Sequence, residues 1–332
     1  MTMQMASFPL RAGARVITVG ECMVELSRGA DGRFGLAYGG DTFNTAVYMA
    51  RGGVRVSYAT ALGDDPYSAG ILTLARTERV GTELIDVMGG RMPGLYMIET
   101  TPEGERSFRY WRDRAAARDL FEGAKADETV AAVAAAGLVY FSGITLSLYS
   151  AKSLDVFADA LAAARNNGGI IVMDSNYRPR GWGGDHARAR STFERFWRLS
   201  HVALPTFEDE QTLWNDTSPT ATASRLASLG IVEIVIKNGA LGALVHFEGC
   251  DRLVMPPPLT AKPVDTTAAG DSFNAAYLTR RISGCTPDMA AAHAHKLAAV
   301  VIQHSGAIVP REATAVVLRT EIKPPEIQMD GR

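Results

Sequence analysis

The chain has 332 residues, 47% of them hydrophobic and 21% charged, and its 34 basic and 36 acidic side chains leave a formal net charge of -2. This balance argues against nucleic-acid binding, which needs a clustered surplus of Lys and Arg. Cys22, Cys250 and Cys285 form no Cys-x-x-Cys pair, so we expect neither a disulfide framework nor a zinc site and interpret all three as small buried hydrophobes. No apolar run reaches the roughly 18 residues of a transmembrane helix, and we expect a cytoplasmic protein.

Short β-branched runs alternate with Ala-rich stretches along the chain. The runs are continuously apolar, as strands buried on both faces of a parallel sheet require, and they lie at 16–19, 137–141, 170–173 and 234–236. The stretches between them carry apolar residues at helical spacing and predict helices at 42–51, 151–165 and 272–281. The repeated strand–helix–strand pattern predicts an α/β fold with helices on both faces of a mostly parallel sheet.

One segment departs from this pattern and predicts an antiparallel hairpin. Two strand-like runs, 94–100 (GLYMIET) and 104–112 (GERSFRYWR), are joined by the turn-forming residues TPE. Period-two alternation divides the second run into two faces, one with Phe108, Tyr110 and Arg112 and the other with Ser107, Arg109 and Trp111. Because neither face is purely apolar, we expect a small sheet that stands off the main domain, with one face over a ligand. We expect the stretch 22–38 to add strands to it.

The strongest local signal is the segment 265–273, DTTAAGDSF, at the start of an expected helix. Its small residues Ala268, Ala269 and Gly270 let the backbone approach a ligand closely, and the free N–H groups of a helix start favour a phosphate. The carboxylate of Asp271 suits a general base that takes the proton of an attacking hydroxyl. The alternative is that Asp271 only caps the helix, and the segment alone does not decide between the two.

A second glycine-rich segment, 39–44 (GGDTFN), leads into the helix expected at 42–51. Gly39 and Gly40 permit a tight turn, whereas Asp41 and Asn44 offer a carboxylate and an amide that suit a hydroxyl-rich ligand. Taken alone, the segment is more simply interpreted as a glycine turn in which Asp41 or Thr42 caps the helix.

Two further loops follow expected strands, at the edge where open α/β sheets bind their ligands. After the strand at 170–173 comes DSNYRP, where Asn176 and Arg178 are placed to meet a ligand. The planar fork of an arginine suits a carboxylate or a phosphate. After the strand at 234–236 come Lys237, Gly239 and Gly242, whose ammonium and backbone amides suit phosphates. The alternatives are a surface arginine and an ordinary turn between strands.

Several other motifs are excluded. The sequence contains no GxxxxGK[ST] and no GxGxxG after the first expected strand, so it predicts neither a P-loop nor nicotinamide binding. His293 and His295 are two residues apart and lie on different faces of a helix, which is poor spacing for metal ligands. We interpret them as helix-surface and packing residues.

Taken together, DTTAAGDSF and GGDTFNTAVYMARGG resemble the two signatures of the ribokinase-like (PfkB) carbohydrate kinases, and the resemblance extends from Val16 to about Pro310. It implies a ribokinase-like α/β fold whose small β-sheet lid closes over the sugar. Within the family, the chain is similar to the bacterial 2-keto-3-deoxygluconate kinases in the order of GECMVELS, PGLYMIET, GERSFRYWR, DSNYRPR, DTTAAGDSF and GAIVPRE. The resemblance therefore implies transfer of the ATP γ-phosphoryl group to the hydroxyl on carbon 6 of that sugar acid, with Mg²⁺.

The resemblance also implies roles for individual residues. Asp271 would be the catalytic base and a substrate contact, and the amides of Ala269, Gly270 and Asp271 would form an anion hole. The other positions that match substrate contacts are Gly39, Gly40, Asp41, Asn44, Tyr96, Tyr110, Arg112 and Arg178. The positions that match nucleotide contacts are Asn176, Lys237, Gly239, Gly242, Ala268, Ala269 and Gly270. Chemistry supports the two arginines independently, because a carboxylate substrate needs bidentate donors.

Two positions depart from the family pattern. Ala268 stands where many relatives have glycine, and its Cβ restricts the φ angle at that position. The residues 206–209, TFED, stand where Asn-x-x-Glu is common near the nucleotide, so we assign no metal ligand.

These features predict one kinase domain at 15–315, with lid strands inserted at about 22–38 and 92–113 and loose tails at 1–14 and 322–332. The expected partners are a small sugar acid, ATP and further copies of the chain bound through the lid, but no nucleic acid or membrane. Two other functions stay open. One is another sugar kinase of the family, such as a fructokinase, which has less need of the arginine pair. The other is a sugar-binding sensor without catalysis, against which the presence of Asp271 argues.

Overall fold

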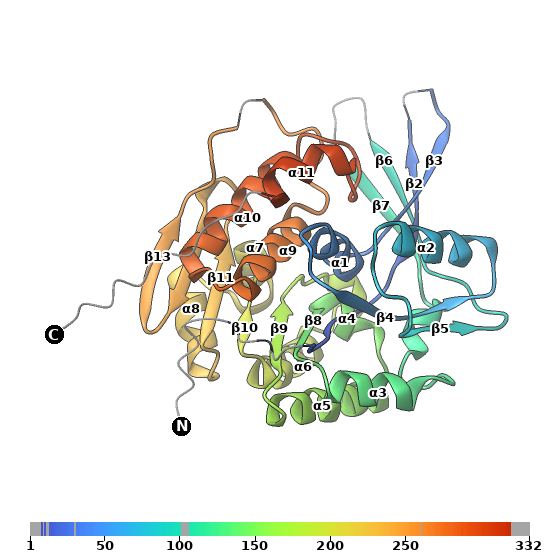
Figure 1. The fold of residues 1–332 in the computed structure, drawn as a ribbon, viewed down its shortest axis with the longest axis horizontal. Helices are drawn as coiled ribbons and strands as arrows, with labels where there is room; N and C mark the ends of the chain where they lie inside the picture. Colours follow the sequence, from blue (N-terminus) through green and yellow to red (C-terminus); the bar gives the residue numbers. More distant parts are fainter. Residues whose placement is uncertain are drawn as a thin grey trace.

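The computed structural model describes residues 8, 10, 13–29, 31–100, 106–259 and 261–319. The tail predicted at 322–332, most of the tail predicted at 1–14 and the turn predicted at 101–103 lie outside these residues. None of the helices in the described ranges is both long and apolar enough to cross a membrane. The elements form an α/β body with a small sheet that projects from it (Figure 1).

The body is built around a nine-stranded sheet with the strand order β13-β12-β11-β10-β9-β8-β1-β4-β5. Its strands are β1 (Val16–Val19), β4 (Val56–Gly63), β5 (Ile85–Met88), β8 (Leu138–Ser142), β9 (Ile170–Asp174), β10 (Val202–Ala203), β11 (Glu233–Lys237), β12 (Ala243–Phe247) and β13 (Cys250–Val254). The neighbours from β11 to β5 are parallel, and β12 and β13 extend the sheet as antiparallel strands. The four predicted strands correspond to β1, β8, β9 and β11, which confirms the predicted fold class.

The central strands alternate between two apolar clusters. In β9, Ile170 and Val172 belong to the cluster on one face of the sheet, whereas Ile171 and Met173 belong to the cluster on the other face. All four side chains are buried. Burial on both faces explains why these strands appear in the sequence as unbroken apolar runs.

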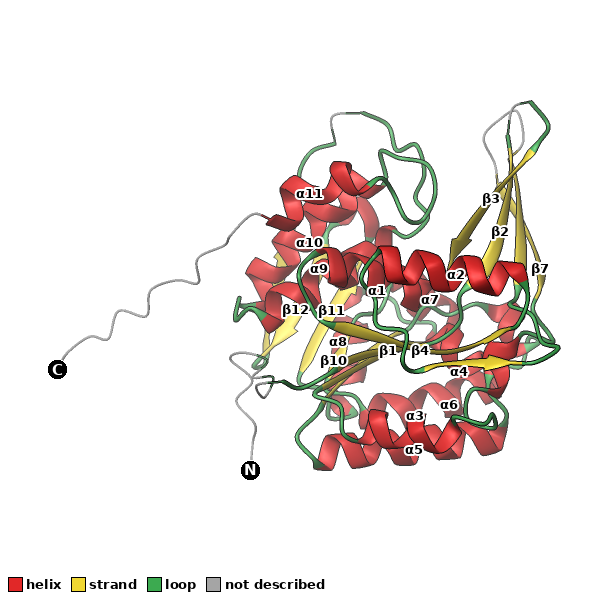
Figure 2. Cartoon of the chain, turned by 45° about the vertical axis from the view of Figure 1, so that its right-hand side comes forward, coloured by secondary structure: helices red, strands yellow, loops and turns green. Residues whose placement is uncertain are grey.

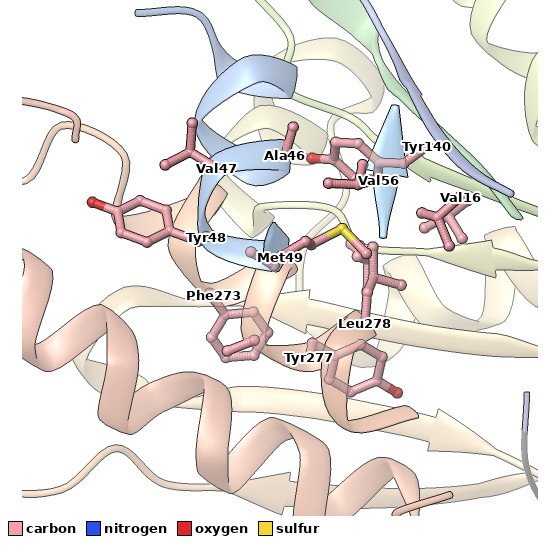
Figure 3. Packing of buried hydrophobic residues seen from close by; sticks show 14 of the residues in the cluster. Val16, Ala46, Val47, Tyr48, Met49, Val56, Tyr140, Phe273, Tyr277 and Leu278 are labelled. Atoms are coloured by element: carbon pink, nitrogen blue, oxygen red, sulfur yellow. The ribbon is translucent and has the colours of Figure 1, made fainter. Parts of the chain in front are cut away.

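Helices cover both faces of this sheet, as Figure 2 shows from the side. One face carries α1 (Asp41–Arg51), α2 (Pro66–Thr77), α9 (Ala269–Ile282), α10 (Pro287–Val301) and α11 (Arg311–Arg319). The other face carries α3 (Ala126–Ala134), α4 (Gly143–Leu148), α5 (Ala151–Asn166), α6 (His186–Leu199), α7 (Phe207–Trp214) and α8 (Pro219–Ser228). The three predicted helices correspond to α1, α5 and α9. Figure 3 shows side chains of α1 and α9, among them Met49 and Leu278, in the first cluster.

The small sheet has the order β3-β2-β6-β7. It consists of β2 (Met23–Arg28), β3 (Phe34–Gly39), β6 (Leu95–Thr100) and β7 (Arg106–Trp111). The pair β6–β7 is antiparallel, as predicted for the hairpin, and β2 and β3 come from the stretch that was expected to add strands. On one face of the sheet, Met23, Tyr96 and Ile98 form a separate apolar cluster with Phe108 against it. We call these four strands the lid.

Two predictions about isolated side chains need correction. All three cysteines are free, and Cys22 and Cys285 are buried as expected, but Cys250 is exposed because it begins the edge strand β13. His293 and His295 are both buried, so the interpretation as packing residues is confirmed and the interpretation as surface residues is wrong. Burial against neighbouring elements lowers the pKa of both imidazoles.

Candidate active site

A cavity of about 1380 Å³ is lined by residues at the carboxyl ends of the parallel strands and by residues of the lid. The main domain contributes the ends of β9 and β11 and the starts of α1 and α9. Residues of β2, β6 and β7 line it from the lid. Cavities that take one small ligand typically measure about 300–1,000 Å³. This cavity therefore has room for two small molecules.

The cavity brings together most residues that the sequence singled out: Gly40, Asp41, Asn44, Tyr96, Tyr110, Arg112, Asn176, Arg178, Lys237, Ala268, Ala269, Gly270 and Asp271. Three predicted glycines are not among its lining residues. Gly39 lies next to the lid tyrosine, since a Cβ built on it would be 3.2 Å from the Tyr96 hydroxyl. Gly239 and Gly242 belong to the turn between β11 and the antiparallel β12, which contains the 3₁₀ helix η3 (Gly239–Leu241).

Asp271 is buried in the first turn of α9. Its Oδ2 accepts a hydrogen bond of 2.8 Å from Asn44 Nδ2 at the start of α1. Burial, and then the negative charge of Asp41, raise the pKa of Asp271 to about 7. A carboxylate with a pKa near neutrality is well matched to taking up a proton under physiological conditions.

The alternative interpretations of both helix starts as side-chain caps are wrong. The N-cap of α9 is Ala268, and Asp271 lies inside the helix with its carboxylate turned to Asn44. The N-cap of α1 is Gly40, which has no side-chain cap either, and Asp41 is the first helical residue. The polar side chains at these two helix starts are thus free to interact with one another and with the cavity.

Asp271 is one of three buried carboxylates that line the cavity, and an asparagine amide donates to each of them. Asn176 Nδ2 donates to Asp41 over 2.8 Å, and Asn274 Nδ2 donates to Asp174 over 2.7 Å. Burial also raises the pKa of Asp41. Because an amide carries no charge, it satisfies a carboxylate oxygen without removing the repulsion between the acids. This repulsion is one reason why the pKa of Asp271 is high.

Lys237 extends from the end of β11 into this group of acids. Its Nζ donates to Asp174 Oδ2 at 3.2 Å and to Asn274 Oδ1 at 2.9 Å. A Cβ built on Gly270 would lie 3.7 Å from the same Nζ. The ammonium therefore lies beside the amino end of α9. A cation and a helix N-terminus at one place favour an anion.

The loop before α9 holds an unusual backbone conformation. Ala268 has φ +59° and ψ +16°, in the left-handed region that glycine adopts more easily. Asp265 fixes the loop, because its carboxylate accepts bonds from the Thr267 N–H at 2.7 Å and the Gly306 N–H at 2.8 Å. This turn lets α9 begin at Ala269, three residues before the predicted start.

The amides at the start of α9 differ in their availability. The Ala269 N–H donates to the Thr266 carbonyl over 3.2 Å. The N–H groups of Gly270 and Asp271 have no backbone acceptor within the described ranges, as expected for the first turn of a helix. Two of the three amides expected to form an anion hole are thus free of backbone acceptors there.

Two buried glutamates hold the lid residues that line the cavity. The Tyr96 hydroxyl donates to Glu25, and Arg112 Nη2 donates to Glu21. The Tyr110 ring lies 6.0 Å from the Tyr96 ring, and Tyr110 is 43% exposed. Neither glutamate was selected from the sequence. Both occur in GECMVELS, but nothing in their local sequence shows that their partners are a tyrosine and an arginine far along the chain.

Two arginines that the sequence analysis did not select also line the cavity. They are Arg118 in the 3₁₀ helix η1 (Ala116–Asp119) and Arg180 in the 3₁₀ helix η2 (Pro179–Trp182). Arg180 Nη1 donates to the Phe108 carbonyl of β7 at 3.1 Å and so connects the main domain to the lid. The predicted Arg178 pairs with Asp209 at 3.1 Å. Arg180 lies in the same DSNYRPR motif as Arg178, whereas no sequence signal marked Arg118.

A cavity with room for two ligands, with cations near free helix amides and a carboxylate whose pKa is near neutrality, suits phosphoryl transfer to a hydroxyl compound. On this fold, with a strand lid over the α/β domain, it defines a ribokinase-like carbohydrate kinase. The comparison with known proteins agrees: the chain belongs to the pfkB family of carbohydrate kinases, whose sequence model matches residues 14–314. The protein is therefore an ATP-dependent carbohydrate kinase.

Individual relatives are similar over most of the chain. The 2-dehydro-3-deoxygluconokinase of Escherichia coli K12 is 40% identical over 307 residues, which cover 90% of this chain and 98% of that protein. A fructokinase of Escherichia coli is 26% identical over 267 residues, which cover 80% of this chain and 84% of that protein. The crystal structure of 2-dehydro-3-deoxygluconokinase from Thermotoga maritima has the same fold, with a TM-score of 0.78 and 22% identity over 92% of this chain and 98% of that chain.

Proposed function

We propose that the protein transfers the γ-phosphoryl group of ATP to the hydroxyl on carbon 6 of 2-keto-3-deoxygluconate. The observation that carries the proposal is the presence of Arg112 on the lid side of a cavity whose main-domain side holds Asp271. A cation on one side suits the carboxylate of a sugar acid, and a base on the other suits its hydroxyl. The name of the relative that is 40% identical supports the same substrate.

In the proposed mechanism Asp271 is the general base. The hydroxyl oxygen of the sugar acid attacks the γ-phosphorus while its proton passes to Asp271. The new P–O bond forms as the bond between the γ-phosphorus and the ADP oxygen breaks, which gives ADP and the phosphorylated sugar acid. The amides of Gly270 and Asp271 and the ammonium of Lys237 then stabilise charge on the transferred group. The Ala269 amide takes part in this anion hole only if its turn bond to Thr266 opens.

Arg112 and Arg178 are the proposed carboxylate ligands. Both line the cavity, and among the described residues neither guanidinium has partners for all five of its N–H donors. A neutral sugar has no group that requires two guanidinium groups, each of which can donate two parallel hydrogen bonds. The remaining proposed substrate contacts, which suit hydroxyl groups, are Gly39, Gly40, Asp41, Asn44, Tyr96 and Tyr110.

The nucleotide is proposed to bind where β11 and α9 contribute to the cavity, with its phosphates near Lys237 and the start of α9. The proposed contacts are Asn176, Lys237, Gly239, Gly242, Ala268, Ala269 and Gly270. Mg²⁺ is proposed to arrive with the nucleotide, because it commonly keeps phosphate and water ligands beside one or two carboxylates. Within the described ranges, no group of three or more His, Cys, Asp or Glu side chains could hold a metal ion, and we assign no protein ligand to it.

A screen of ADP release over sugars and sugar acids tests the proposal. We expect turnover of 2-keto-3-deoxygluconate or of its galactonate-derived epimer, which differ in the direction of one hydroxyl. The second candidate, a fructokinase, has the support of the relative that is 26% identical. Turnover of fructose or ribose with none of either keto acid would refute our proposal in its favour. Binding of the keto acid without any ADP release would instead indicate a sensor.

We also propose that the lid mediates self-association. The strand register places Leu36, Leu26, Met97 and Arg109 in one row on the face opposite Tyr96 and Tyr110, and Tyr38, Val24, Leu95 and Trp111 in the next. Phe34, Leu36 and Trp111 are strongly exposed there. Light scattering of the intact protein and of a Trp111→Ser variant tests this proposal. A monomeric wild type would refute it.

A further inference from the structure

Glu21 lies between β1 and β2 and is a buried carboxylate with one charged partner among the described residues. Its Oε2 accepts a hydrogen bond from Arg112 Nη2, and the two side chains are 1% and 16% exposed. The other oxygen, Oε1, is buried without a hydrogen-bond partner in the described part of the chain. A carboxylate that is buried with one oxygen unsatisfied is costly, which calls for an explanation in terms of function.

The pair is tightly enclosed on two sides. A Cβ built on Gly94 would lie 2.6 Å from Glu21 Oε1 and 3.1 Å from Arg112 Cβ, so the pair fits only because residue 94 has no side chain. A Cβ built on Gly40 would lie 1.9 Å from the Glu21 carbonyl oxygen. The backbone of Glu21 thus packs directly on a glycine that lines the cavity, while its side chain is held against the lid.

Arg112 lines the cavity, and only one of its donors has a partner among the described residues. One N–H of Nη2 is directed to Glu21, and Nε is buried without an acceptor in the described residues. No hydrogen bond joins Nη1 to another described residue, and Arg112 lines the cavity. One edge of the guanidinium is therefore fixed by Glu21, and the donors of Nη1 are left for a ligand. An arginine that was not held in place would have to lose side-chain conformational entropy before its guanidinium could bind a ligand in the same orientation.

We propose that Glu21 is a positioning residue that fixes the guanidinium of Arg112 and thereby sets the preference for a carboxylate substrate. The inference rests on the proposed function, since it assumes that Arg112 binds the carboxylate of a sugar acid. Glu21 does not line the cavity, so it acts through Arg112 and not by touching the substrate. Its charge partly neutralises Arg112, which makes recognition depend on geometry more than on net attraction.

The test compares Glu21→Gln with the wild type on 2-keto-3-deoxygluconate and on its methyl ester, which lacks the charge. Glu21→Gln keeps an oxygen that can accept from Arg112 but removes the negative charge that holds the guanidinium, so we expect it to raise the KM for the acid about 10-fold. The KM for the ester, the KM for ATP and the kcat should change by less than about twofold, because neither the base nor the anion hole is altered. In an Arg112→Ala background, Glu21→Gln should have no further effect.

Two other variants separate positioning from general destabilisation. Glu78→Gln is a matched control, because Glu78 forms a similarly buried ion pair of 2.8 Å with Arg51 away from the cavity; it should leave the KM for the acid unchanged. Gly94→Ala keeps both charges but places a methyl group against the pair, and its backbone is not in the left-handed region. It should raise the KM for the acid in the same way, even if Glu21→Gln does not fold.

The outcomes distinguish the two proposals. A wild type without turnover of either keto acid overturns the proposed function and this inference with it. If the wild type is active and Glu21→Gln has the same KM for the acid, the inference alone is overturned. Should Glu21→Gln not fold, an unchanged KM in Gly94→Ala overturns it instead. So does an increase in KM that is equally large for the ester, or one that persists in the Arg112→Ala background.

Discussion

Replacing Asp271 by asparagine removes the proposed base and keeps the shape of the side chain. The side-chain carbonyl oxygen introduced by Asp271→Asn can still accept the bond from Asn44 Nδ2 that the carboxylate accepts at 2.8 Å. We therefore expect substrate binding to persist. Turnover should fall about 10²–10⁴-fold, the usual contribution of a positioned general base.

The same substitution should stabilise the protein at neutral and alkaline pH. The Asp271 carboxyl has a pKa of 3.8 in an ordinary environment and about 7 in the folded protein, chiefly because it is buried. Each pKa unit corresponds to about 1.4 kcal/mol, so ionising the buried group costs at most about 4 kcal/mol. Because its pKa is raised in the folded protein, the Asp271 carboxyl contributes its full share to the free energy of unfolding below pH 3.8. This contribution is lost as the pH rises through about 7. Asparagine never ionises, so the stability of the variant relative to the wild type should increase as the pH rises.

Two measurements check these expectations. Thermal unfolding at pH 5 and pH 8 should show a larger gain for Asp271→Asn at pH 8, and kcat/KM of the wild type should fall as the pH drops below about 7. Asp113→Asn is a suitable control, because Asp113 is an exposed carboxylate on the same cavity. A variant with nearly normal turnover would refute the role as base. Equal stability differences at the two pH values would refute the raised pKa.

Three further predictions concern neighbouring residues. Arg112→Ala should lower kcat/KM for the acid substrate by the equivalent of about 1.5–3 kcal/mol, the range for a charged hydrogen bond. An equal loss for the methyl ester would contradict the role of Arg112 as a carboxylate ligand. Lys237→Met should lower kcat about 10²-fold or more, as for loss of one donor to the transition state. It should also move the acid limb of the pH–rate profile upward, because Lys237 lowers the pKa of Asp271, and a limb that moves downward would contradict this. Ala268→Gly should raise the thermal midpoint by relieving about 1 kcal/mol of backbone strain at φ +59°, whereas Ala269→Gly, inside the helix, should lower it.

The elements that the sequence predicted correctly are those with a strong local pattern. Strand β9 appears as an unbroken apolar run because both of its faces are buried, and α1 and α5 have apolar residues at helical spacing. Helix α9 begins at Ala269, whereas apolar spacing predicts a helix only from Ser272. The left-handed Ala268 turns the chain so that Ala269 and Gly270 are already helical, and this cannot be seen from their residue types.

Most of the predicted site residues line the cavity, but their pairings could not be predicted. Small-residue motifs at the starts of two expected helices indicated Asp41 and Asp271, and a loop after an expected strand indicated Lys237. The bond from Asn44 to Asp271 joins residues 227 positions apart, and the bond from Arg112 to Glu21 joins residues 91 positions apart. Local sequence signals do not carry such pairings. They depend on how α1, α9 and the lid pack together.

The pairings also bear on how a chain with a net charge of -2 would bind the two anionic substrates proposed for it. Three cations that line the cavity already have carboxylate partners: Arg112 with Glu21, Arg178 with Asp209 and Lys237 with Asp174. Each partner neutralises charge but occupies only part of the donors that an arginine or lysine carries. The cavity thus needs no surplus of positive charge, because each partner directs the unused donors of its cation. In the proposed function, specificity for an anion depends on buried acids such as Glu21 as much as on the arginines themselves.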